Sequence, residues 1–141
     1  MKDFKEAREL MRDYDFDIET VREMFDNSDH DMEDGNYRII DSDSIDEIMQ
    51  EELKSDLYIL GCFNANFLAN ILGISTKAIE MFQKSEAYKG IGELIISGGH
   101  LEELQEDYVS ADGYGHHFAH YDGNEYEIEI NGNNYYIFKT N

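Results

Sequence analysis

The stretch GYGHHFAHYDGNEYEIEINGNNYYIFKTN (113–141) decides how the end of this chain folds. Within it, glutamates alternate with tyrosine and isoleucine along EYEIEI (125–130), which is the period-two pattern of a strand with one buried face. The Asp-Gly pair at 122–123 and the Asn-Gly pair at 131–132 favour tight hairpin turns. The stretch therefore predicts a three-stranded antiparallel meander over residues 115–140.

Three of the five histidines lie in the same stretch and raise the question of a metal site. If the segment is a strand, His116 and His120 point the same way but lie about 13 Å apart, which is too far for one ion. His117 then points to the opposite face. A zinc site would need His100 or Cys62 as further ligands, so we predict neither a metal site nor any other cofactor.

Upstream of the tail, apolar residues recur every three or four positions, which is typical of amphipathic helices. Ser44 and Glu47 form a capping box before one such helix, whose inward residues are Ile45, Ile48, Met49 and Leu53. The uncharged run from Leu57 to Leu72 indicates one central, buried helix. Further helices are expected at residues 3–12, from 17 onward, 76–84, 86–96 and 101–108, a short strand at 37–40, and an acidic loop at 26–35.

Together these patterns predict an α+β fold with a helical N-terminal and central body and a C-terminal three-stranded meander. At 141 residues the chain has the length of one domain. We divide it into an acidic helical and loop region (1–56), apolar core helices (57–109) and the β-meander (110–141).

The composition excludes several functional classes. One cysteine, Cys62, forms no internal disulfide, and the charged N-terminus has no apolar segment typical of a secretory signal. We therefore expect a cytoplasmic protein without a membrane anchor. Neither a phosphate-binding loop, nor a G-x-S-x-G motif, nor a dinucleotide fingerprint is present. We predict that the chain is not an enzyme.

Negative charge is the dominant feature of the sequence. Thirty-two acidic residues against eleven basic ones give a net charge of −21. Residues 1–56 hold twenty acids and seven bases, whereas 57–84 hold one acid and two lysines. Such a chain repels nucleic acid and is attracted to basic surfaces. The candidate partner-binding residues lie in the acidic loop (Asp29, Asp31, Glu33 and Asp34) and around the capped helix (Asp43, Asp46, Glu47 and Glu51).

The acidic loop also suggests calcium, but its spacing does not match an EF-hand, whose glycine and closing glutamate are out of place. On a helix, Asp43, Glu47 and Glu51 recur every fourth residue, with a rise of about 6 Å per step. That array agrees with the phosphates of DNA in sign and scale.

The segment ANFLANILGISTKAIEMFQK (65–84) resembles the helix-turn-helix of DNA-binding regulators. Ala69, Gly73 and Ile79 occupy the positions where that family has a small residue, a turn glycine and a β-branched core residue. The resemblance implies two packed helices, and the surrounding negative charge opposes binding to phosphate. The residues that would read DNA are Thr76, Lys77, Glu80, Gln83 and Lys84.

The segments ADGYGHHFAHYDGNEYEI (111–128) and DLYILGCFNANFLA (56–69) look like those of small acidic proteins from bacteriophages and other mobile elements. In size and charge the chain is similar to the antirestriction and anti-CRISPR inhibitors that imitate DNA. The likeness of the two segments implies a phage or mobile-element origin. The likeness in size and charge implies an inhibitor in the cytoplasm of a host bacterium, whose partner is a basic nucleic-acid-binding protein and which itself binds no nucleic acid. A helix-turn-helix regulator and an acidic structural or interaction protein are the alternatives.

Overall fold

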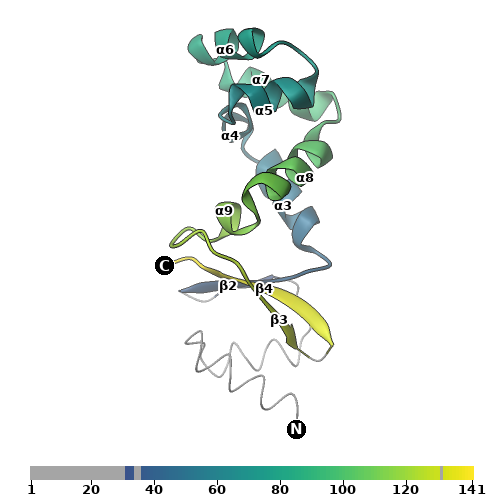
Figure 1. Cartoon of the computed structure of the whole chain (residues 1–141), viewed down its shortest axis with the longest axis vertical. Helices are drawn as coiled ribbons and strands as arrows, with labels where there is room; N and C mark the ends of the chain where they lie inside the picture. The colour runs from purple at the N-terminus through teal and green to yellow at the C-terminus, as the bar shows by residue number, and fades with distance from the viewer. Residues whose placement is uncertain (1–30, 34–35, 131) are drawn as a thin grey trace. The chain divides into compact units, whose positions relative to one another are not determined.

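The computed structural model of the chain describes residues 31–33, 36–130 and 132–141 (Figure 1). The expected helices at 3–12 and from 17 onward lie outside these residues. The fold is α+β and divides into two compact units, one made of residues up to Ile45 together with Asp112–Asn141, the other of Asp46–Ala111.

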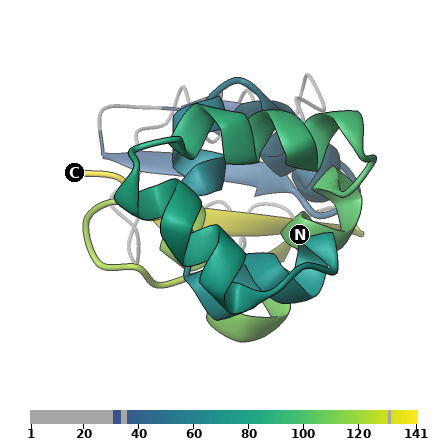
Figure 2. The ribbon, with the colours of Figure 1, turned by 90° about the horizontal axis from the view of Figure 1, so that it is seen from above.

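The first unit contains a four-stranded antiparallel sheet. Its strands are β1 (Asp31–Glu33), β2 (Tyr37–Asp41), β3 (Tyr126–Ile130) and β4 (Asn133–Lys139), in the order β1-β2-β4-β3. Figure 2 shows β2 and β4, blue and yellow, side by side although they lie far apart in the sequence. The predicted strand at 37–40 is confirmed, as is the hairpin around the Asn-Gly pair, because Ile130 pairs with Asn133.

The predicted three-stranded meander is wrong in its first strand and in its strand number. Residues 115–118 form a short helix, α9 (Gly115–Phe118). Gly113 has a φ of +79°, and the backbone N–H of Gly115 donates to the Glu125 carboxylate at 3.2 Å. A Cβ on Gly115 would overlap the carbonyl oxygen of Gly123. The chain after α9 is therefore folded back against it, which the strand pattern alone does not reveal.

The sheet also contains residues 31–33, which the sequence predicts to belong to the acidic loop at 26–35. Residues 31–33 form β1, which pairs with β2 through partners such as Met32 and Ile39. The guanidinium of Arg38 donates to both carboxylate oxygens of Asp31, at 2.9 and 2.7 Å, and lies 4.9 Å from the centre of the Phe118 ring. A bidentate ion pair thus joins two neighbouring strands.

The core of this first unit uses both faces of the central strands β2 and β4, because adjacent residues of each strand are buried, Ile39 with Ile40 and Ile137 with Phe138. Ile39, Ile137 and Phe138 are fully buried, and Phe118 of α9 contacts Phe138 at a centroid distance of 5.0 Å. The period-two pattern of the tail predicts the burial of Tyr135 and Ile137 on β4 correctly, but Tyr126 on β3, assigned to the same apolar face, is exposed.

The second unit is helical. Its helices are α3 (Ile45–Lys54), α4 (Leu57–Gly61), α5 (Ala65–Leu72), α6 (Thr76–Lys84), α7 (Tyr88–Ser97) and α8 (Leu101–Asp112). Three of the four predicted inward residues of α3 are confirmed, because Ile45, Met49 and Leu53 are buried, whereas Ile48 is only half-buried. The helices expected at 76–84, 86–96 and 101–108 are present as α6, α7 and a longer α8.

The single central helix expected at 57–72 is wrong. The chain leaves the helical path at Cys62 and enters α5 at Ala65, because the Asn64 side chain caps the new helix by accepting from the backbone N–H of Asn66 at 2.9 Å. Several side chains of this apolar run, Tyr58 and Ile59 among them, are exposed. Of the helices in the described part of the chain, none is both long and apolar enough to cross a membrane.

Helices α4 and α7 cross with their backbones in direct contact. A Cβ on Gly61 would overlap the carbonyl oxygen of Tyr88, and one on Gly92 would overlap that of Leu57. The two glycines therefore allow an approach that any side chain would prevent. This crossing fixes α7 against α4 and so positions the turn that precedes α7.

Candidate functional site

The largest group of like charges on the described helices lies on α3 and α8. These two helices together contain nine carboxylates and one lysine. On α8 the buried side is formed by Leu104, Gln105 and Tyr108, so the remaining positions are turned toward solvent. The exposed carboxylates are Asp46, Glu47 and Glu51 on α3 and Glu102, Glu103, Glu106, Asp107 and Asp112 on α8.

A buried amide joins the two acidic helices. Gln105 is only 1% exposed and is the one buried polar side chain among the described residues. Its Nε2 donates to Oδ1 of Asp46 at 2.8 Å, and its Oε1 accepts from Nε2 of Gln50 at 3.0 Å. Because a buried amide left without partners is costly, these bonds specify how α3 meets α8. Asp46, predicted to bind a partner, therefore also has a structural role.

The other predicted partner-binding residues lie on different elements of the structure. Asp31 is engaged by Arg38, and Glu33 is exposed on β1. Asp43 lies in the turn before α3, where its backbone N–H donates to Oδ1 of Asp41 at 2.8 Å. The prediction that Asp43, Glu47 and Glu51 form one array along a helix is therefore wrong for Asp43, which lies before α3 begins.

Partner binding by the remaining candidates on α3 stays a prediction. Glu47 and Glu51 are exposed and one helical turn apart. Asp29 and Asp34 lie outside the described residues. Asp31, Glu33 and Asp43 belong to the first unit, whereas Asp46, Glu47 and Glu51 belong to the second.

Sequence reasoning missed the acidic side of α8. The signal is present in LEELQED (101–107), where Glu102 and Glu106 are one turn apart, as are Glu103 and Asp107. A charge count over residues 1–56 does not include these carboxylates, because α8 lies after the neutral middle of the chain. The candidate site is therefore the pair of acidic helices α3 and α8, in which α8 takes the place of the acidic loop beside the capped helix α3.

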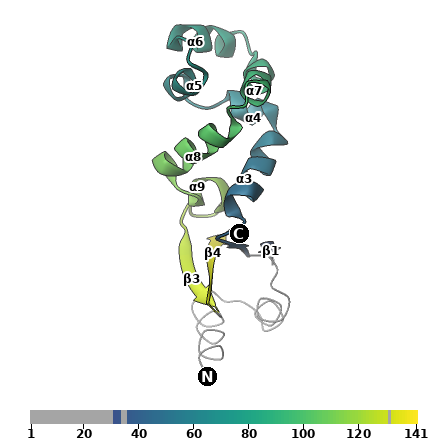
Figure 3. The same ribbon diagram turned by 90° about the vertical axis from the view of Figure 1, so that its right-hand side faces the viewer.

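The segment 65–84 forms two helices joined by a tight turn, as its resemblance predicts (Figure 3). Gly73 ends α5 with a φ of +69°, and Ser75 caps α6 by accepting from the N–H of Ala78 at 3.1 Å. Ala69 and Ile79 are both buried between the helices and their neighbours. The expected packing of Ala69 and Ile79 is therefore confirmed, whereas Ile74 and Phe82, two further apolar positions of the resemblance, are exposed.

Two of the five residues that would read DNA contact the protein itself. Thr76 donates from its hydroxyl to Oδ1 of Asn66 at 2.9 Å. Gln83 donates to the carbonyl oxygens of Gly61 and Phe63, at 3.0 and 2.9 Å. Lys77, Glu80 and Lys84 remain as exposed polar side chains of α6.

The histidines of the tail lie on and just after a helix. His116 and His117 belong to the last turn of α9, and His117 packs edge-on against Phe118 at a centroid distance of 4.6 Å. The strand-based reason for excluding a metal is therefore wrong. Within the described parts of the chain, His, Cys, Asp and Glu side chains form no group of three or more that could hold an ion. Cys62 is exposed after α4 instead of packed in a core helix.

Comparison of the chain with protein-family models, with curated protein sequences and with solved structures gives no match.

Proposed function

We propose that the chain inhibits a basic nucleic-acid-binding protein of a bacterial host, a CRISPR effector or a restriction enzyme, by occupying its nucleic-acid groove. The single observation that carries the proposal is the acidic pair α3 and α8, in which nine carboxylates accompany one lysine. The proposed carboxylates substitute for phosphates, and no chemistry is performed by the inhibitor.

The charge arrangement on α8 is unfavourable for the helix itself. Like charges one turn apart weaken a helix by about 0.2–0.5 kcal/mol per pair, and α8 has two such pairs, Glu102 with Glu106 and Glu103 with Asp107. No lysine or arginine within α8 offsets this repulsion. An arrangement that costs stability in the isolated protein and is relieved by a basic partner supports a binding role for this surface.

The carboxylate spacing supports imitation of a phosphate backbone in scale. Carboxylates four residues apart on α3 or α8, such as Glu47 and Glu51, are separated by one turn, or about 6 Å along the axis, whereas each DNA strand presents a charge about every 3.4 Å of its axis. A lysine- or arginine-lined groove that accepts DNA would release its counterions to such a surface in the same way. The affinity should then fall steeply with salt, because exposed charges are screened over about 8 Å at physiological ionic strength.

A second candidate function is DNA binding by the helix-turn-helix, and the α5–Gly73–α6 geometry favours it. The side chains of Thr76 and Gln83 already make hydrogen bonds within the protein, which argues against DNA binding by α6. Lys77 and Lys84 are the remaining bases of α6, which is few for a protein whose affinity would depend on phosphate contacts.

Chromatography at low salt separates the two functions. On heparin or DNA-cellulose, an inhibitor that imitates DNA is repelled and flows through, whereas a DNA-binding regulator is retained and elutes as the salt concentration rises. Retention that is lost on changing Lys77 and Lys84 to Gln would support the regulator and contradict the proposed mimicry.

A further inference from the structure

The turn between α6 and α7 contains a strained residue where glycine is usual. Glu86 has a φ of +61°, the one positive φ among non-glycine residues in the described ranges. The backbone N–H of Ala87 donates to the carbonyl oxygen of Phe82 at 2.8 Å, and that of Glu86 donates to Gln83 at 3.0 Å. This is the helix-ending pattern in which glycine avoids a steric penalty. Glutamate is less favourable than glycine at this position, which points to a role for its carboxylate.

Two tyrosine rings lie next to this turn. Tyr58 of α4 and Tyr88 of α7 have ring centroids 5.1 Å apart and planes tilted by 59°. Tyr58 is 51% exposed, although a side chain of this size gains from burial. Because the α4–α7 crossing at Gly61 and Gly92 holds both helix backbones together, the two rings are presented on a rigid support.

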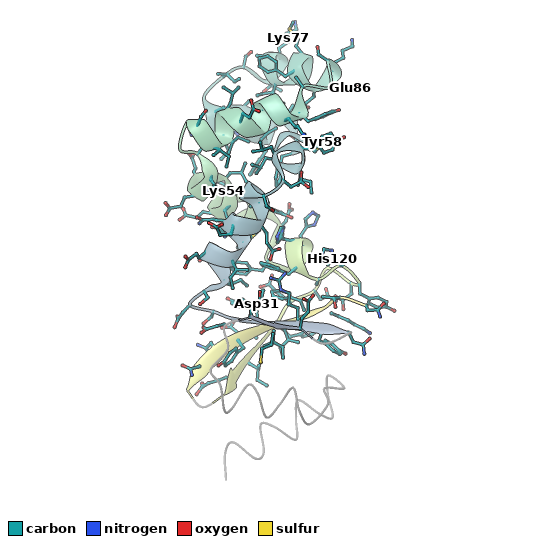
Figure 4. All side chains as sticks on the ribbon, turned by 180° about the vertical axis from the view of Figure 1, so that it is seen from behind. Asp31, Lys54, Tyr58, Lys77, Glu86 and His120 are labelled. Carbon is teal, nitrogen blue, oxygen red and sulfur yellow. The ribbon has the colours of Figure 1, made fainter. Side chains whose placement is uncertain are left out.

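The carboxylate and the rings lie on the same side of the helical unit. Figure 4 shows Tyr58 and Glu86 extending toward the same side, with Glu86 above Tyr58. The pKa of Tyr58 is raised above its ordinary value, first by the charge and hydrogen bond of Cys62, then by burial and by the negative charges of Tyr88 and Glu86. Tyr58, Tyr88 and Glu86 therefore form one corner, which we call the tyrosine corner.

We propose that the tyrosine corner is a binding site for an arginine side chain of the basic partner. A guanidinium stacks on the face of a tyrosine ring and pairs with a carboxylate through parallel hydrogen bonds. The corner offers both kinds of contact on one rigid support. The site rests on the proposed function for the identity of its partner, but its chemistry is independent of α3 and α8.

The carboxylate of Glu86 favours an arginine over a purely apolar side chain as the occupant of the corner. Residues 57–100 hold three glutamates and three lysines, so the surface has no net attraction for bases in general. Glu86 is the acidic residue of the turn, and lysines lie on both sides of it in the sequence, Lys84 on α6 and Lys89 on α7. A partner arginine would thus be recognised by geometry as well as by charge.

The test is a titration of the whole chain, with its tyrosine rings isotopically labelled, with N-acetyl-arginine amide followed by NMR. We expect the ring signals of Tyr58 and Tyr88, assigned with Tyr58→Phe and Tyr88→Phe, to shift and saturate. The neutral isostere N-acetyl-citrulline amide should leave them unchanged. The proposal would be overturned if capped arginine, raised to about 100 mM, shifted neither ring signal. It would also be overturned if the citrulline compound shifted them equally.

Two variants of Glu86 separate binding from folding. Glu86→Gln keeps the strained backbone and removes the charge, and it should weaken arginine binding about two- to fivefold. Glu86→Gly should weaken binding to the same extent while raising the melting temperature, because glycine relieves the positive φ. Tyr58→Leu should also weaken binding about two- to fivefold through loss of the ring. Unchanged affinity in all three variants would contradict the proposed site.

The proposed function and the proposed arginine site are disproved by different results. If capped arginine binds the corner but the protein does not compete with DNA for any basic enzyme, the inhibitor proposal is wrong and the corner stands. If competition with DNA is observed but capped arginine does not shift the two tyrosines, the corner is wrong and the acidic surface stands.

Discussion

Gln105 of α8 donates a hydrogen bond of 2.8 Å to the carboxylate of Asp46 on α3, across the contact between the two acidic helices. The same amide accepts from Gln50 at 3.0 Å, so one buried side chain of α8 is hydrogen-bonded to two residues of α3. The acidic surface therefore depends on a neutral residue beneath it. That dependence gives the first prediction.

Changing Gln105 to Leu should destabilise the protein by about 1–3 kcal/mol, because Gln50 and Asp46 lose a buried partner. Urea unfolding followed by circular dichroism measures the change. The control is Glu106→Gln, one residue along on the exposed side of α8, which should change the unfolding free energy by less than about 0.5 kcal/mol. Equal effects of the two variants would show that the Gln105 hydrogen bonds do not hold α3 to α8.

Two glycines of α7 should respond oppositely to alanine. Gly92 lies against the carbonyl group of Leu57, whereas a Cβ on Gly90 would have nothing within 4 Å. We expect Gly92→Ala to lower the unfolding free energy by about 1–3 kcal/mol through overpacking. Gly90→Ala should raise it by about 0.5–1 kcal/mol through better helix propensity. Thermal unfolding of both variants checks the prediction, and a stabilising Gly92→Ala would contradict the close α4–α7 crossing.

The sheet should lose stability at alkaline pH through Tyr135. This side chain is 3% exposed, and its pKa is raised, first by burial and then by the charge of Asp41, against a smaller lowering by the hydrogen bond with Asn133. A tyrosine in the unfolded chain ionises near pH 10. Because the folded pKa is higher, the stabilising contribution is complete below about pH 10 and is lost as the pH rises through the folded value.

Replacing Tyr135 by Phe removes this ionisable group from the buried site. Urea unfolding between about pH 8 and pH 11 should show a smaller loss of stability in Tyr135→Phe than in the parent chain. Tyr121→Phe, at a 65% exposed position, is the matched control and should follow the parent. A parent and a Tyr135→Phe variant with parallel pH profiles would show that Tyr135 does not need to ionise on unfolding.

The sequence predicts the helical patterns and the terminal hairpin well, because both depend on local periodicity. The buried faces of α3 and β4 follow directly from spacings of three to four and of two residues. The turn in 65–84 was recognisable because Gly73 and the two helices around it are adjacent in the chain. Each of these features is determined by residues within about twenty positions of one another.

The errors arise where one particular contact, and not the periodicity of apolar residues, decides the structure. The first strand of the predicted meander is the helix α9, since Gly115 packs against the carbonyl group of Gly123. The break in 57–72 follows from a cap at Asn64 within an otherwise apolar run. The contribution of α8 to the acidic surface depends on Gln105 meeting Asp46, fifty-nine residues away in the chain, and no local pattern encodes that pairing.

The central claim is tested most directly by competition between the protein and DNA for a panel of purified restriction enzymes and CRISPR effectors. Glu47→Gln, Glu51→Gln and Glu106→Gln are combined in one variant of the acidic pair. Glu80→Gln, Glu93→Gln and Glu127→Gln form a control that removes the same charge from exposed positions elsewhere. For an enzyme that the parent displaces from DNA, we predict that the first variant loses competition, that the control retains it, and that salt weakens the parent steeply. Simultaneous binding of DNA and the parent protein, or equal loss in both variants, would contradict mimicry by α3 and α8.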